Sequence, residues 1–260
     1  MAAEDFDIYV FDLDGTLLNT LEDLYLATNA AMRHVGAAER TKDEVRAFVG
    51  NGIKLLITRA LGARAADEAV FNRAFSYFKE YYGAHMYDHT APYAGVLEML
   101  RRLNAAKKRV AVVSNKADFA VKGLCERYFG ELCGVAIGEN EAAGIRKKPA
   151  PDSVFAAIEK LGGGKAVYIG DSEVDIETAK NAGLPCISVC WGFKSEEFLI
   201  AHGAEKCVHS PEEIFCKICC RIKNTSAVRG GAFFSGGREM KSKKESENGR
   251  ERERRKRERR

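Results

Sequence analysis

The feature that most constrains the fold is the alternation of short apolar runs with helical patterns after about residue 90. Apolar runs without polar alternation are typical of strands that are buried on both faces of a parallel sheet. Strands that alternate with helices predict an α/β fold, here a doubly wound, Rossmann-like parallel sheet with helices on both faces. The expected strands are 6–13, 109–114, 134–138, 166–171, 186–190 and 206–209, and the expected helices between them are 94–105, 117–128, 151–161, 173–182 and 195–202.

A helical segment interrupts this alternation directly after the first strand. Residues 20–85 contain no convincing strand; Thr41 and Glu44 form a capping-box pattern, and Gly50–Asn51–Gly52 breaks one helix and restarts another. We therefore expect a small all-helical cap domain inserted into the α/β core. The expected boundaries are 1–18 and 88–222 for the core, 19–87 for the cap and 223–260 for a tail.

The positive charge of the chain is concentrated at its C-terminal end. The whole chain has a net charge of +4, but residues 221–260 hold 15 Lys and Arg against six Glu, which leaves residues 1–220 mildly acidic at −5. Residues 223–260 are rich in Gly, Ser and charge, so they cannot bury enough apolar surface to offset the entropy of ordering, and we expect disorder. The interleaved glutamates weaken the positive potential of this tail and disfavour nucleic acid as a partner.

The cysteines and the apolar runs bear on cellular location. Eight cysteines among 260 residues are too few for the disulfide framework of a small secreted domain, and most of them lie in apolar surroundings. Cys216, Cys219 and Cys220 lack a second ligand pair at zinc-binding spacing, which favours helix packing over a metal site. We find no stretch of transmembrane length and no secretion signal, so we predict a cytoplasmic protein without membrane contacts. The sequence carries no sign of the oligomeric state.

Polar and charged residues gather where the expected strands end. The carboxyl ends of parallel strands meet at one edge of an open sheet, and ligands bind there. Each group alone has a local explanation, since a strand can end in an Asx turn and Ser172 can cap the next helix. Their convergence on one edge favours a functional site. The residues are Asp12 and Asp14 at the end of the first strand, Ser114 and Asn115 at the end of the second, Asp171 at the end of the fourth with Asp175 following, and Lys148 before the helix at 151–161.

The charges of this edge suggest phosphate chemistry. Several carboxylates repel one another unless a hard cation holds them, and Mg²⁺ prefers oxygen ligands and often binds a substrate phosphate as well. With a phosphate bound, one aspartate of the pair Asp12 and Asp14 can attack phosphorus and form an aspartyl phosphate. The other can protonate the leaving oxygen and later deprotonate a water molecule. Gly15 permits the tight turn that follows them.

Four motifs of the chain resemble, in order, the four motifs of the haloacid dehalogenase-like phosphatases: FDLDGTLLNT, VVSN, KKPAPD and GDSEVDIETAKNAG. The resemblance covers roughly residues 6–215. It implies the Rossmann-like core of that superfamily, a small helical cap after the first strand, and a Mg²⁺-dependent phosphomonoester hydrolase that works through an aspartyl phosphate.

The resemblance also implies a role for each matching residue. Asp12 would be the nucleophile, and Asp14 the general acid and base. Ser114 and Lys148 would hold the phosphoryl oxygens, Lys148 being the lysine adjacent to the proline. The implied metal ligands are Asp12, Asp14 through its backbone carbonyl, and Asp171, with Asp175 in support. The implied substrate-binding residues are Gly15, Thr16, Asn115, Asn51 and Gly52.

Within this family, the stretches YVFDLDGTLLNT, VGNG, APYAGVLEMLRRL and VAVVSNKAD look most like phosphoglycolate phosphatases. The favoured substrate is therefore a small phosphorylated metabolite, 2-phosphoglycolate. In the cap, VGNG is either a plain helix break or a loop whose backbone N–H groups approach the substrate. Lys54 and Arg59 either contact a substrate carboxylate or lie on a solvated helix face.

Other functions stay open at this stage. A sugar phosphomutase of the β-phosphoglucomutase type, a pyrophosphatase or another sugar phosphatase would use the same scaffold. A phosphomutase would have to exclude water and pass the phosphoryl group to a second hydroxyl. A more remote alternative is a protein that binds nucleic acid or an acidic partner through its tail.

Overall fold

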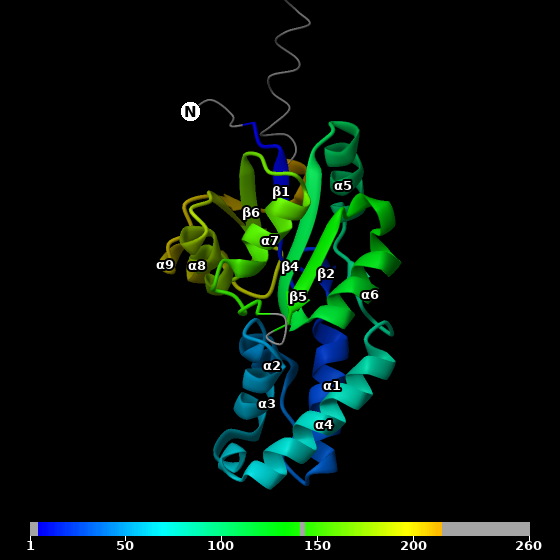
Figure 1. Ribbon diagram of the computed structural model, residues 1–260. Helices are drawn as coiled ribbons and strands as arrows, with labels where there is room; N and C mark the ends of the chain where they lie inside the picture. Colours follow the sequence, from blue (N-terminus) through cyan, green and yellow to red (C-terminus); the bar gives the residue numbers. More distant parts are fainter. Residues whose placement is uncertain (1–4, 141–143, 215–260) are drawn as a thin grey trace, which may run out of the picture. The chain divides into compact units, whose positions relative to one another are not determined.

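The computed structural model describes residues 5–140 and 144–214, which belong to one compact unit (Figure 1). The expected tail and the cysteine cluster Cys216, Cys219 and Cys220 lie outside the described residues. The strands are β1 (Ile8–Phe11), β2 (Leu18–Asn19), β3 (Ala91–Pro92), β4 (Arg109–Ala117), β5 (Val135–Glu139), β6 (Ala166–Gly170), β7 (Cys186–Val189) and β8 (Cys207–Val208). The helices are α1 (Leu21–His34), α2 (Lys42–Phe48), α3 (Ile53–Leu61), α4 (Glu68–His85), α5 (Val96–Ala105), α6 (Asp118–Tyr128), α7 (Asp152–Lys160), α8 (Glu173–Asn181) and α9 (Glu196–Ala201), with 3₁₀ helices η1 (Gly62–Ala66) and η2 (Gly130–Leu132). None of the described helices is long and apolar enough to span a bilayer.

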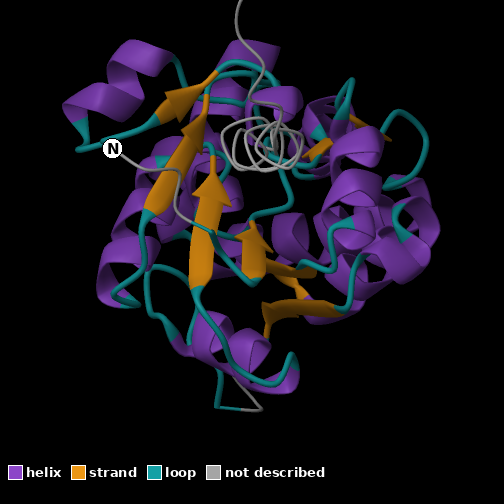
Figure 2. Cartoon of the chain, turned by 90° about the horizontal axis from the view of Figure 1, so that it is seen from above, coloured by secondary structure: helices purple, strands orange, loops and turns teal. Residues whose placement is uncertain are grey.

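Six strands form one parallel sheet in the order β5-β4-β1-β6-β7-β8. The first strand of the chain lies near the middle of the sheet, between β4 and β6, and strands are added on both sides of it. Helices lie on both sides of the strands in Figure 2. The predicted doubly wound α/β fold is therefore confirmed.

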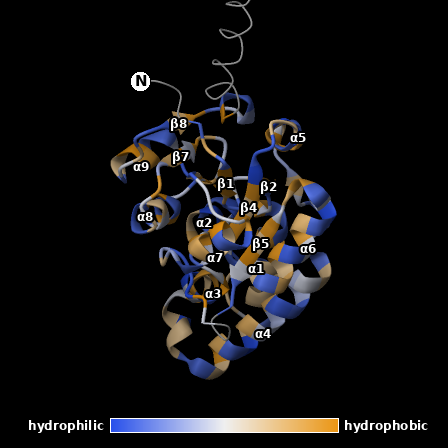
Figure 3. Cartoon of the chain, turned by 45° about the horizontal axis from the view of Figure 1, so that its top comes forward, coloured by the Kyte–Doolittle hydropathy of each residue, from blue (hydrophilic) through white to orange (hydrophobic). Residues whose placement is uncertain are grey.

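Alternate residues of the central strand enter two different apolar cores, because successive side chains of a strand point to opposite faces. Tyr9 and Phe11 pack with residues of α5 and α6, whereas Ile8 and Val10 pack with residues of α7 and α8. All four side chains are fully buried. The apolar colour of the strands in Figure 3 reflects this burial on both faces. Burial on both faces fixes the strands, and with them the residues that follow the strand ends.

The strand boundaries differ from the expected ones in two informative places. The first strand ends at Phe11 rather than at residue 13, so Asp12 already lies beyond it. The second expected strand, 109–114, continues to Ala117, with a register shift against β5 between Val113 and Ala117. Ser114 and Asn115 therefore lie within an irregular strand end rather than after it.

The segment between β2 and β3 is helical, as expected. Helices α1–α4, which we call the cap segment (Leu21–His85), share an apolar core of their own that includes Met32, Ile57 and Phe78. The predicted capping box at Thr41 and Glu44 begins α2. The sequence did not reveal the short antiparallel pair β2–β3, which brings the two ends of the cap segment side by side.

Candidate active site

The residues that follow β1 and β6 meet at one edge of the sheet because these strands are neighbours. Asp12 comes directly after β1, and its backbone N–H donates to the carbonyl of Ile169 at 2.9 Å. Asp171 comes directly after β6, and Asp175 lies in the first turn of α8. Carboxylate oxygens of Asp12, Asp171 and Asp175 lie within 4.8 Å of one another, and all three residues are buried.

Lys148 lies at the centre of this carboxylate cluster. Its Nζ donates to Asp12 Oδ1 at 2.7 Å and to Asp175 Oδ1 at 2.8 Å. Lys148 is 4% exposed, so these bonds take the place of contacts with water. The hydroxyl of Tyr168 lies 3.1 Å from Lys148 Nζ and donates to Asp175 Oδ1. A buried ammonium with two carboxylate partners is held in one position.

Burial raises the pKa of Asp12 to about 7, although Lys148 pulls it down. Burial and the nearby Asp175 and Asp12 raise the pKa of Asp171 well above its usual range. For Lys148, burial acts downward, but the two partner carboxylates dominate and its pKa lies well above the usual value. The cluster thus holds more negative charge than its single lysine balances.

A set of short contacts holds Asp171 in place. Thr16 Oγ1 donates to Asp171 Oδ1 at 3.0 Å, and the backbone N–H of Phe193 donates to Asp171 Oδ2 at 2.7 Å. Gly15 and Gly192 pack against the same carboxyl group so closely that a Cβ on either would lie 2.3 Å from an atom of Asp171. Two loops far apart in the sequence therefore position one carboxylate.

Asp14 faces a second lysine, Lys116, which the sequence did not single out. Lys116 Nζ donates to both carboxylate oxygens of Asp14 at 2.9 Å, and Thr20 Oγ1 donates to Oδ1 at 2.7 Å. The Lys116 ammonium also lies 4.8 Å from the ring centre of Tyr82 in α4. Burial lowers the pKa of Lys116, but Asp14 and Tyr82 outweigh this and raise it. The signal was present in the sequence, because Lys116 and Ser114 are two residues apart on one strand end and so share a side.

Ser114 and Asn115 lie beside this pair and have different partners. Ser114 Oγ accepts a hydrogen bond from the backbone N–H of Lys116 at 3.3 Å. The Asn115 side chain accepts from Lys148 N at 2.7 Å and donates to Lys148 O at 3.0 Å, which fixes the backbone of that lysine. Its amide also donates to the carbonyl of Gly50 at 3.2 Å, so Asn115 links the sheet edge to the cap segment.

A small pocket of about 40 Å³ lies between the sheet edge and the cap segment. Its wall from the cap segment is apolar side chain and glycine backbone, whereas its wall from the sheet is polar. Asn51 and Lys54 line a second, larger pocket of about 290 Å³ that shares Gly52 with the first. The lining residues of the small pocket are Asp12, Asp14, Leu24, Val49, Gly50, Gly52, Ile53, Leu56, Ser114, Asn115 and Lys116.

Gly15, Thr16 and Arg59 make other contacts in this structure. Gly15 and Thr16 are not among the residues that line the small pocket; both pack on Asp171 instead. Arg59 donates to the carbonyl of Phe48 at 2.8 Å and holds the end of α2. Of the two basic cap residues considered above, only the exposed Lys54 lies in a pocket wall.

The profile of the haloacid dehalogenase-like hydrolases matches residues 9–189 of the chain. The chain belongs to this family. It is 32% identical over 193 residues to a phosphoglycolate phosphatase of Pseudomonas syringae pv. tomato (72% of this chain, 70% of the relative). It is 34% identical over 193 residues to a phosphoglycolate phosphatase of Agrobacterium fabrum (71% and 80%). A crystal structure of a protein from Lactobacillus delbrueckii subsp. bulgaricus superposes with a TM-score of 0.77 at 36% identity and covers 83% of this chain and 99% of that one.

This haloacid dehalogenase-like chain is a phosphatase-type enzyme by its relatives, and its buried carboxylates fit a metal ion. Four carboxyl groups, those of Asp12, Asp14, Asp171 and Asp175, face two ammonium groups, so the site would carry a net charge of minus two with all four ionised. Buried charge of this kind is costly unless it is paired, and a divalent cation would balance it. The donor set is all oxygen, which suits a hard cation such as Mg²⁺.

Proposed function

We propose that the chain is a Mg²⁺-dependent phosphomonoester hydrolase that acts on a small phosphorylated metabolite, 2-phosphoglycolate, through an aspartyl phosphate. The observation that carries the proposal is the position of Asp12, with one carboxylate oxygen on Lys148 at 2.7 Å and a place in the wall of the small pocket. A nucleophile needs a fixed position next to its substrate, and the bond to Lys148 and the place in the pocket wall support this role for Asp12. The names of the relatives support the substrate.

In the proposed reaction, Asp12 attacks the phosphorus of the substrate and the bond from phosphorus to the leaving oxygen breaks. Asp14 gives a proton to that oxygen, and then takes a proton from the water molecule that hydrolyses the aspartyl phosphate. Asp14 accepts bonds from Lys116 and Thr20, so its carboxyl group is oriented before the substrate arrives. The two aspartates therefore have separate partners and separate tasks.

Lys148 and Ser114 are the proposed contacts for the phosphoryl oxygens. An ammonium group near the attacking carboxylate offsets the negative charge that collects around phosphorus in the transition state. Asp12 and Asp171, with the backbone carbonyl of Asp14, would hold the Mg²⁺ ion. The bound ion would supply further positive charge for the phosphoryl oxygens.

Asp175 is proposed to support the metal site through its contacts with the protein and not as a principal ligand of the ion. Its Oδ2 accepts from the backbone N–H and the hydroxyl of Ser172 at 3.1 and 2.6 Å. Its Oδ1 accepts from Lys148 and Tyr168. Both oxygens thus have partners within the protein, and the main effect of Asp175 is to position Lys148.

The cap segment is proposed to select the substrate, as a cap domain with the boundaries 19–87, through backbone groups of Gly52 and the side chain of Asn51. A narrow pocket with an apolar upper wall favours a small substrate over a nucleotide or a polymer. The described cysteines, Cys125, Cys133, Cys186, Cys190 and Cys207, are all unpaired, which supports a reducing, cytoplasmic setting.

The test combines a variant with a substrate screen. Purified protein with Mg²⁺ is assayed for phosphate release from 2-phosphoglycolate, hexose phosphates, nucleoside monophosphates and pyrophosphate. We expect the highest kcat/KM for 2-phosphoglycolate, and loss of turnover in Asp12→Asn with the fold retained by circular dichroism. An Asp12→Asn protein that still hydrolyses p-nitrophenyl phosphate would sink the covalent mechanism. Interconversion of a hexose 1-phosphate without phosphate release would select the phosphomutase instead.

A further inference from the structure

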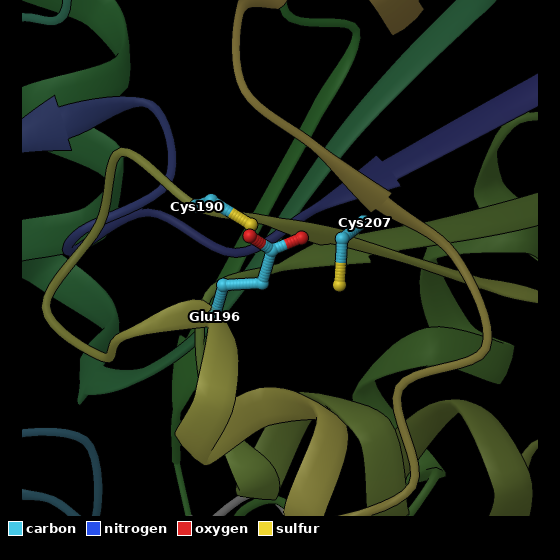
Figure 4. A group of neighbouring side chains, drawn as sticks. All are labelled: Cys190, Glu196 and Cys207. Carbon is cyan, nitrogen blue, oxygen red and sulfur yellow. The ribbon is translucent and has the colours of Figure 1, made fainter.

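A second cluster of metal-ligating side chains lies at the far edge of the sheet, outside the candidate active site. It consists of Cys190 directly after β7, Cys207 at the start of β8, and Glu196 at the start of α9. Ser188 is the register partner of Cys207, and Cys190 lies two residues further on, so the two cysteines share one face of the sheet. Figure 4 shows the three side chains directed into a common space between the strand ends and the helix.

The distances within this cluster suit a single cation. One ligand atom from each of Cys190, Glu196 and Cys207 lies within 4.8 Å of the other two. In a tetrahedral zinc site, two zinc–sulfur bonds of about 2.3 Å place the sulfur atoms about 3.8 Å apart, so shifts of up to about 1 Å bring all three atoms into range. All three residues are half-buried, which leaves a path for an ion and shields the bound state from water.

The donor set differs in kind from that of the candidate active site. Two thiolates and a carboxylate favour a soft or borderline cation such as Zn²⁺ over Mg²⁺, which prefers oxygen. His209 Nε2 lies 3.1 Å from Glu196 Oε2, and an imidazole that orients a ligating carboxylate is a common outer partner of metal sites. Ser195 caps α9 by accepting from Phe198 N, which fixes the start of the helix that carries Glu196.

We propose that Cys190, Glu196 and Cys207 bind a thiophilic divalent cation of the zinc class, and that this cation ties together the two ends of the loop from β7 to α9. Cys190 is the first residue of that loop and Glu196 follows its last. Cys207 anchors both to the neighbouring strand.

This loop also reaches the candidate active site. Phe193 donates its backbone N–H to Asp171, and Trp191 Nε1 donates to the carbonyl of Thr16 at 3.0 Å. Gly192 packs on the Asp171 side chain. A cation at the ends of the loop therefore restricts the segment that positions Asp171. The proposal that a cation binds here does not depend on the proposed reaction. Only an influence of this cation on turnover would rest on the proposed function.

The test uses the full-length, freshly reduced protein, freed of metal and then titrated with Co²⁺ in excess Mg²⁺, which occupies oxygen sites. Thiolate ligation of Co²⁺ gives a charge-transfer absorption that carboxylate sites lack. We expect this absorption in the wild type, its displacement by Zn²⁺, and the loss of one bound equivalent in Cys190→Ser and Cys207→Ser. His209→Ala should weaken binding by about 10–100-fold. Thermal unfolding with and without Zn²⁺ is a second readout, because a ligand of the folded state raises the midpoint.

Matched controls separate this cluster from the other thiols. Cys186→Ser changes a cysteine of the same strand and should leave the absorption intact, as should the combined Ser variant of Cys216, Cys219 and Cys220. Absorption that persists in folded Cys190→Ser and Cys207→Ser proteins contradicts the proposal. Absence of the absorption in the reduced wild type also contradicts the proposal. If peptide mapping then finds a Cys190–Cys207 disulfide in the protein exposed to air, the two cysteines form a redox pair and not a cation site.

Discussion

The sheet edge and the glycine turn of the cap segment face the same small pocket, but they are held by different interactions. At the sheet edge, Asp12, Lys148 and Asp175 are buried and each makes at least one charged hydrogen bond to another. In the turn, Gly50 and Gly52 contribute backbone atoms only. The side-chain amide of Asn115 donates a hydrogen bond from the sheet to the carbonyl of Gly50. Charged hydrogen bonds hold the pocket wall at the sheet edge, whereas backbone conformation shapes the wall at the glycine turn.

This difference suggests a division between chemistry and selectivity. Removing one partner of a buried ion pair strongly lowers the free energy of unfolding, because the other charge stays buried without a partner. The sheet edge therefore tolerates few substitutions. A turn on the surface of a helical segment can vary without disturbing a core. We therefore expect substitutions at the sheet edge to affect stability and kcat, and substitutions in the turn to affect KM.

The largest effect is expected for Lys148→Met. The substitution keeps the volume of the side chain but leaves Asp12 and Asp175 buried without their cation, which costs about 3–5 kcal/mol of unfolding free energy. Urea denaturation measures the loss, and the phosphatase assay should show kcat reduced by orders of magnitude. Lys147→Met is the matched control, because that neighbouring lysine is exposed, and it should stay within about 0.5 kcal/mol of the wild type. Equal losses for both variants would refute the assignment of Lys148.

The next effect concerns pH and metal. Asp12 has a pKa near 7 in the folded protein because of burial, against an ordinary value of 3.8, so the folded state holds this proton where the unfolded chain has lost it. Between about pH 4 and 7, Asp12 should therefore lower the stability of the metal-free protein as pH rises, by at most about 1.4 kcal/mol per pH unit. Mg²⁺ needs the ionised carboxylate, so its stabilising effect should grow over the same range.

Urea denaturation at several pH values, with and without Mg²⁺, checks this dependence. Asp12→Asn removes the titrating group, and the difference in stability between wild type and variant isolates its contribution. A difference that is flat from pH 4 to pH 7 would show that Asp12 ionises normally in the folded protein.

A smaller effect is expected for Lys116→Met. Asp14 would lose two bonds at 2.9 Å but keep its bond from Thr20 and some contact with water, so the cost should be about 1–3 kcal/mol. If Asp14 carries the proton of the reaction, kcat should fall while binding of Mg²⁺ is unchanged. Lys122→Met breaks the exposed ion pair with Asp118 and should cost less than about 1 kcal/mol. Unaltered kcat in a folded Lys116→Met protein would separate Lys116 from the chemistry.

The same contrast explains what the sequence could and could not predict. Asp12, Lys148 and Asp171 lie next to strand ends or a helix start, where local patterns are strong, and the order of elements predicted that these ends meet. The strand pattern places Lys116 on the same side as Ser114, but it does not reveal its partners, which are Asp14, 102 residues away, and a ring of the cap segment. The family motif implies a substrate contact for Thr16, but motif position alone does not reveal that its hydroxyl donates to Asp171.

The cap segment could be predicted only as a set of helices. Its capping box at Thr41 is a local pattern and was recognised, whereas the β2–β3 pair joins residues more than 70 positions apart and has only two residues per strand. Which side of the Gly50–Gly52 turn faces the pocket depends on how α2 and α3 pack, and no local pattern encodes that. In the structure, Gly50 lines the small pocket, Asn51 lines the larger one, and Gly52 lines both.

The smallest effect on kcat is expected for Gly52→Ala, which changes the turn and leaves the charged sheet edge intact. Gly52 has φ +83°, and a Cβ there would lie 3.3 Å from Glu139 and 3.4 Å from the backbone of Asn115, so alanine strains the backbone and narrows the pocket. Gly52 has ψ 165°, a backbone region essentially restricted to glycine, so we expect a loss of about 1–3 kcal/mol in stability. We also expect a rise in KM for 2-phosphoglycolate of up to about tenfold, equivalent to about 1.4 kcal/mol of binding. Gly36→Ala also places alanine at a positive φ, +62°, but with nothing within 4 Å, so it should lower the stability of the cap segment without changing KM. If both variants raise KM equally, the turn acts through the stability of the cap segment and not through contact with the substrate.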